Sequence, residues 1–89
     1  MENDVVFVGK KPIMAYVLAI LTHLNSGHDA VFIKARGSMI SKAVDISQVV
    51  KRKFSKDLKI SNIEIGTEEI KTEENKHRDV SFISVEMKR

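Results

Sequence analysis

Two short basic turns carry the side chains of this sequence that are best suited to binding chemistry. Gly9-Lys10-Lys11-Pro12 follows one short apolar run, and Lys34-Ala35-Arg36-Gly37 ends another. Lysine and arginine bind phosphate, lysine as a point charge and arginine through two parallel hydrogen bonds. A helix that begins at the proline adds the positive end of its dipole, which also favours an anion. For the lysine pair alone, a solvated turn that only aids solubility is the alternative.

The elements around these turns must bring them together. Apolar periodicity predicts a buried strand over residues 5–8, a helix over 12–25 with the proline at its first position, and a strand over 30–35. This β-α-β order favours parallel strands with a right-handed crossover, so both basic turns should leave the same edge of the sheet. The cations expected at this edge are Lys10, Lys11, Lys34 and Arg36.

A second helix is predicted over about residues 39–54, with Ser38 or Ser41 as its cap. Several cations crowd its end, where they suit the helix dipole. Its apolar stripe consists of Ile40, Ala43, Val44, Val50 and Phe54.

Two long strands are predicted over residues 60–70 and 78–87, joined by a polar hairpin tip at 71–77. Ile60 is out of phase with Ile63, which predicts a bulge or a late strand start. The complete order is β-α-β-α-β-β, an α/β fold in two layers, and residues 1–89 are expected to form one domain.

The charge is unevenly distributed. The chain of 89 residues has a net charge of +3, but residues 1–60 hold 10 Lys/Arg against 5 Asp/Glu, whereas residues 61–89 hold 5 against 7. A basic patch should therefore be built by the first two-thirds of the chain, and a polyanion is its natural partner.

Other kinds of chemistry have little support. The chain has no cysteine, its three histidines lack metal-ligand spacing, and no nucleophile elbow or Walker loop occurs. We expect no enzyme activity, no cofactor and no metal, and interpret His23 as a partly buried, hydrogen-bonded residue. The apolar stretch 13–24 is too short to span a membrane, and the acidic start lacks a signal-peptide n-region, so a cytoplasmic protein is expected.

Three segments of the chain carry a family resemblance: residues 6–14 with GKKPIM, residues 33–37 with KARG, and residues 40–45 with ISKAVD. Together they resemble the Alba family of archaeal chromatin proteins. The resemblance implies a two-layer α/β sandwich like the C-terminal domain of translation initiation factor three. It also implies homodimers, or heterodimers with a paralogue, that bind double-stranded DNA and RNA with little sequence preference. Such a protein would be associated with the chromosome.

The resemblance also implies roles for particular residues. One lysine of the pair, Lys10 or else Lys11, is an acetylation candidate, and loss of its charge would weaken phosphate binding. Phe54 corresponds to a residue that makes contacts between dimers on DNA; from its type alone, a core position is the alternative. The two long strands would form an arm that reaches along the minor groove. The candidate nucleic-acid-binding residues are Lys10, Lys11, Lys34, Arg36, Gly37, Ser38, Lys42, Lys76 and Arg78.

Two features depart from the family pattern. Ser38 stands where many members have a further arginine, which lowers the charge of the patch although its hydroxyl can still donate to a phosphate. The hairpin is acidic, with Glu68, Glu69, Glu73 and Glu74 near its tip, which disfavours entry into an electronegative groove. Binding to structured RNA is the second hypothesis, and a scaffold protein or a small enzyme are weaker alternatives.

Overall fold

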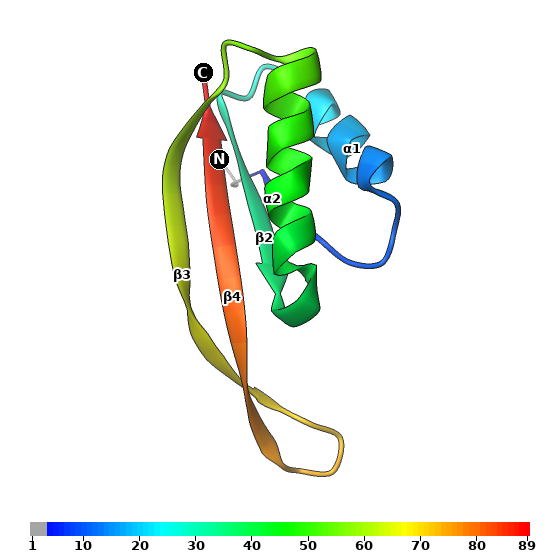
Figure 1. Cartoon of the computed structure of the whole chain (residues 1–89), viewed down its shortest axis with the longest axis vertical. Helices are drawn as coiled ribbons and strands as arrows, with labels where there is room; N and C mark the ends of the chain where they lie inside the picture. Colours follow the sequence, from blue (N-terminus) through cyan, green and yellow to red (C-terminus); the bar gives the residue numbers. More distant parts are fainter. Residues whose placement is uncertain (1–3) are drawn as a thin grey trace.

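Two helices cover one face of a four-stranded sheet in the computed structural model, which describes residues 4–89 (Figure 1). A short 3-10 turn, η1 (Gly37–Met39), precedes the second helix, and a π-helical segment, η2 (Val50–Phe54), continues it. The predicted β-α-β-α-β-β order and the α/β class are confirmed. The elements are β1 (Val5–Phe7), α1 (Ile13–Asn25), β2 (Ala30–Arg36), α2 (Ile40–Val49), β3 (Lys59–Lys71) and β4 (His77–Lys88).

The strands lie in the order β1-β2-β4-β3, and β1 is parallel to β2 as predicted. Both pairings of β4 are antiparallel. The predicted irregularity near Ile60 is confirmed, because the β3–β4 register shifts between Ile60 and Asn62. This bulge changes the face on which the later residues of β3 point.

The core lies between the sheet and the helices. Val31, Ile33 and Ala35 of β2 are buried beneath the helices, as their alternation predicts, so Phe32, Lys34 and Arg36 belong to the opposite, open face. Each helix contributes apolar side chains at helical spacing to this core. Those that are fully or almost fully buried are Val17, Ile20 and Leu24 of α1 and Ala43 and Ile46 of α2.

Three local predictions were wrong. Pro12 is the N-cap of α1, with ψ of 152°, and the helix begins one residue later. Neither Ser38 nor Ser41 caps α2, because η1 leads directly into the helix and Met39 occupies the N-cap position without a side-chain bond. Val44 was placed in the apolar stripe but is 41% exposed and does not belong to the buried core.

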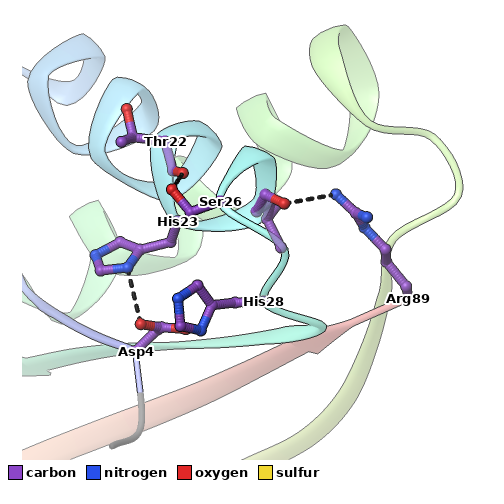
Figure 2. A network of polar contacts seen from close by, with 7 residues as sticks. Asp4, Thr22, His23, Ser26, His28 and Arg89 are labelled. Carbon is purple, nitrogen blue, oxygen red and sulfur yellow. Dashed lines mark hydrogen bonds and ion pairs between the residues drawn. The ribbon is translucent and has the colours of Figure 1, made fainter.

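Polar contacts join α1 to the residue before β1, the loop before β2 and the residue after β4 at one end of the molecule (Figure 2). Asp4 bonds two rings, with His23 Nδ1 at 2.9 Å from one carboxylate oxygen and His28 Nδ1 at 2.6 Å from the other. Arg89 donates to the carbonyl of Leu24 at 3.1 Å, which ties the chain end to α1. The expectation that His23 is partly buried and hydrogen-bonded is confirmed.

The hairpin of β3 and β4 projects beyond the body at the opposite end (Figure 1). The molecule is consequently elongated, with extents of 44 × 27 × 19 Å. Its loop is residues 72–76, one residue shorter at each end than predicted, and Asn75 adopts a positive φ of 64° there. No helix within residues 4–89 is long and apolar enough to cross a membrane.

Candidate nucleic-acid interface

A buried tyrosine of α1 makes hydrogen bonds to the backbone of the loop between β1 and α1. The hydroxyl of Tyr16 accepts hydrogen bonds from the backbone N–H groups of Gly9, at 2.7 Å, and Lys11, at 3.2 Å. Tyr16 lies one turn into α1 and is only 8% exposed. Gly9 leaves room for this contact, since a Cβ there would lie 3.3 Å from the hydroxyl oxygen. Both N–H groups are therefore already hydrogen-bonded within the protein.

Lys42 fastens the same loop from the other helix. Its ammonium group donates to the carbonyl of Gly9 at 2.8 Å and also to the carbonyl of Lys11. It lies 5.5 Å from the centroid of the Tyr16 ring, within the range of a cation–π contact. The sequence had placed Lys42 among the phosphate-binding residues, but two of its three donors are used inside the protein.

The four predicted cations gather at the carboxyl ends of β1 and β2. Phe7 and Lys34 are register partners, and the N–H of the next residue, Val8, donates to the carbonyl of Lys34 at 2.9 Å. The basic turns therefore leave the sheet side by side. Lys10 and Lys11 are exposed and Lys34 is half-buried. We call Lys10, Lys11, Lys34 and Arg36 the basic edge.

One member of the basic edge is already paired. Arg36 lies 2.8 Å from a carboxylate oxygen of Glu68 on β3, and their side chains are 59% and 39% exposed. No ion pair within residues 4–89 involves Lys10, Lys11 or Lys34. The edge thus combines three lysines with one paired arginine. Because the pair is exposed, water or another anion can replace Glu68 as the partner of Arg36.

Gly37 and Ser38 continue the edge into η1. Gly37 has a φ of 55°, a left-handed conformation that disfavours any residue with a side chain. Both residues are exposed, as is Arg36, which precedes them. Glycine is required here because the chain must turn sharply from β2 into the helix.

Lys76 and Arg78 lie on the projecting hairpin rather than at the basic edge. Arg36 is the register partner of Phe82 in β4. Arg78 lies four residues from Phe82 toward the hairpin tip, which is about 13 Å at the usual rise of a strand. Acidic groups stand close by: Lys76 lies 4.0 Å from Glu74, in a pair that is almost fully exposed. The structure therefore separates the predicted set into an edge and an arm.

Phe54 ends η2 and is 49% exposed. It is absent from the buried core, whereas Val50 of the same segment is fully buried. The two side chains therefore lie in different environments, although both belong to the predicted apolar stripe.

A second exposed apolar surface lies on β3. Ile63 and Ile65 pair with Val85 and Ile83, which are buried, yet they are 56% and 74% exposed. The helices contact β2 and β4 and leave the β3 edge of the sheet uncovered. The alternation predicted the strand correctly but could not show that no helix within residues 4–89 covers this part of it.

Within residues 4–89, no group of three or more histidine or acidic side chains is arranged to hold a metal ion.

The fold and the site together define a class of small α/β proteins in which cations from a loop and from the end of the neighbouring strand share one sheet edge and a long hairpin projects beyond the body. Comparison with known proteins gives the family. The family model described as Alba matches residues 4–67.

Relatives match over most of the chain. DNA/RNA-binding protein Alba from Methanocella arvoryzae is 48% identical over 88 residues, which are 99% of this chain and 92% of the relative. DNA/RNA-binding protein Alba 1 from Archaeoglobus fulgidus is 50% identical over 74 residues, 83% of each chain. The chain belongs to the Alba family.

Solved structures agree with the fold. Alba from Thermoplasma volcanium superimposes with a TM-score of 0.90 at 42% identity, covering 97% of this chain and all of that one. ALBA1 from Trypanosoma brucei has a TM-score of 0.81 at 18% identity, covering the whole of this chain and 71% of that one, and shows the shared fold alone. The expected family and fold are both confirmed.

Proposed function

We propose that this protein binds double-stranded DNA without sequence specificity, through phosphate contacts made by the basic edge. The observation that carries the proposal is that the loop after β1, with Lys10 and Lys11, and the end of β2, with Lys34 and Arg36, lie at one rim of the sheet. Contacts to phosphate position a protein on a duplex and carry no sequence information. The role is binding rather than catalysis, and residues 1–89 act as one domain. The names of the similar Alba proteins, which mention DNA and RNA, support it.

The loop is organised before any ligand arrives. Tyr16 and Lys42 fix the backbone of Gly9 and Lys11, on both sides of Lys10, while the lysine side chains stay exposed. A preorganised loop loses less conformational entropy on binding, so more of the electrostatic attraction appears as affinity. In this proposal Lys42 positions the loop, and Ser38 and Gly37 add a hydroxyl and close backbone approach to a phosphate.

We assign the exposed apolar surface of β3 to a second copy of the chain. Ile63 and Ile65 continue the buried face of β4 past the point where the helices end, and Val44 of α2 is also exposed. A two-fold axis through this surface would cover the same side chains on both copies, as in most homodimers. A paralogue with the same surface could replace one copy. The dimer would present two basic edges and two arms to one duplex.

Further roles follow from the same arrangement. Lys76 and Arg78 lead the arm toward the groove, while the nearby glutamates limit how deeply it enters. Phe54, half exposed at the end of η2, is available for contacts between neighbouring dimers. Acetylation of Lys10, or of Lys11, would remove one charge from the edge and loosen the complex. Such a protein would act on the chromosome in the cytoplasm.

The salt dependence of binding tests the proposal. If about 4–8 phosphates are neutralised per dimer, the logarithm of the affinity should fall against the logarithm of salt with a slope of roughly −4 to −7. Replacing Lys10 and Lys11 by alanine should make the slope shallower by about 0.9 for each lost contact, equally for unrelated sequences. A flat salt response, or a loss confined to one sequence, would refute backbone recognition.

Structured RNA is the second candidate ligand, since a cationic edge that reads phosphates also suits an A-form duplex. Competition between duplex DNA, duplex RNA and a folded RNA at one salt concentration ranks them. Preferential binding of the folded RNA would replace the DNA proposal.

A further inference from the structure

The open face of the sheet, away from the helices, contains a cavity beside the basic edge. It has a volume of about 370 Å³, within the roughly 300–1,000 Å³ of small-molecule sites. Cross-strand pairing aligns one row of its lining, Phe7–Lys34–Ser84–Glu64, across all four strands. Arg36, Glu68 and Phe82 also line it.

Two aromatic rings bound this cavity. Phe7 is 71% exposed, an unusual position for a phenylalanine on a strand of a small protein. Phe82 leans over Gly66 of β3, where a Cβ would lie 2.8 Å from the ring, so the absent side chain gives the ring its space. An exposed phenylalanine ring beside a cavity is a surface on which a flat ligand can stack.

The polar groups of the cavity carry both signs of charge. Lys34 and Arg36 come from β2, and Glu64 and Glu68 come from β3. A simple anion would be repelled by the carboxylates. A purely apolar ligand would leave Lys34 and Glu64 without partners, whereas Arg36 and Glu68 already pair with each other. A nucleotide satisfies both sides, because its phosphate suits the cations and the amino group of its base donates to a carboxylate.

The cavity is continuous with the site of the proposed function. Phe7 and Val8 also line a shallower hollow formed by Gly9, Lys10 and Lys11. A strand whose phosphates lie on the lysine pair therefore passes the mouth of the cavity. We infer that the cavity takes one unpaired, amino-bearing nucleobase of a bound strand, stacked on Phe7 and hydrogen-bonded to Glu64. This inference rests on the proposed binding of nucleic acid.

The test compares three hairpin duplexes that differ at one position: fully paired, with a bulged cytosine, and with a bulged abasic residue. The abasic bulge has the same bend and flexibility but no base, so it isolates stacking. Fluorescence anisotropy should show the cytosine bulge bound at least about fivefold more tightly than the abasic one, the low end of base–aromatic stacking. Uracil, which lacks the amino group, should fall between them, in both RNA and DNA hairpins.

Variants then locate the effect. Phe7→Ala should reduce the ratio between the cytosine and abasic bulges to about one, and Phe7→Leu, which keeps an apolar side chain, does the same if the alanine variant folds poorly. Glu64→Gln should remove the preference for cytosine over uracil. Leu18→Ala is the matched control, because Leu18 is also exposed, at 59%, and does not line the cavity.

The outcomes separate this inference from the proposed function. Equal binding of cytosine and abasic bulges by the unchanged protein would overturn the base-binding cavity while duplex binding stands. A preference that survives Phe7→Leu would place the base elsewhere and would also overturn it. Failure to bind even the fully paired hairpin would refute the proposed function itself.

Discussion

Tyr16→Phe tests whether the lysine loop is preorganised, because it removes one oxygen atom and no charge. The ring remains to fill its buried position, while the N–H groups of Gly9 and Lys11 lose their acceptor. Each hydrogen bond contributes roughly 0.5–1.5 kcal/mol net, and the longer one at 3.2 Å belongs at the lower end. The free energy of unfolding should therefore fall by about 1–2 kcal/mol.

Denaturant and thermal unfolding, followed by circular dichroism, measure this change at a fixed protein concentration, since dimerisation would make stability depend on concentration. For a chain of this size, the melting temperature should drop by roughly 4–16 °C. Affinity for duplex DNA should fall by about two- to tenfold through the looser loop, with an unchanged slope against salt because no cation is lost.

Lys10→Ala should have the opposite pattern of effects from Tyr16→Phe: a changed salt slope and an unchanged stability. It should make the salt slope shallower by about 0.9 and leave the free energy of unfolding within about 0.5 kcal/mol, because Lys10 is exposed. If Tyr16→Phe left both stability and affinity unchanged, water would be replacing the hydroxyl, and the loop would not depend on it. If Tyr16→Phe instead changed the slope, its effect would be electrostatic and the reasoning would fail.

Three further perturbations address other parts of the surface. Glu68→Gln should raise DNA affinity by up to about fivefold at low salt, because it frees the arginine of an exposed ion pair worth no more than about 1 kcal/mol; weaker binding in a titration would contradict this. Ile65→Lys, at a side chain 74% exposed, should keep the fold but shift sedimentation from dimer to monomer, and a persistent dimer would locate the interface elsewhere. Phe54→Ala should reduce cooperativity on long duplexes in band-shift assays while binding to a short duplex is retained; an unchanged long-duplex curve would remove its role between dimers.

Sequence periodicity predicted the elements well because each one buries a face. The strand of residues 30–36 and the helix of residues 13–25 have apolar side chains at the spacing that their own geometry demands. Helix caps were predicted less well. Ser38 and Ser41 are good capping residues by type, but a 3-10 turn enters α2 directly and neither is used.

The basic edge could be predicted from the sequence because parallel strands end at the same side of a sheet, and one pair of cations follows β1 while the other lies at the end of β2. The residues that hold the lysine loop in place could not be predicted in this way. Lys42 reaches the Gly9 carbonyl across 33 positions of the chain, and a long flexible side chain gives no periodic signal of its partner. The sequence also showed no sign of the bonds that Tyr16 makes, although a buried tyrosine hydroxyl usually has a hydrogen-bond partner.

The sequence by itself determined the order of the elements, the two cationic turns and the family, because local spacing and residue type carry that information. Only the tertiary structure decided which alternating side chains are covered. Ile63 and Ile65 have the pattern of core residues but lie past the helices, and Phe7 lies beside a cavity that four strands build together. Exposure is a property of what packs against a residue, and for an edge strand or an open sheet face that neighbour is set by the whole fold.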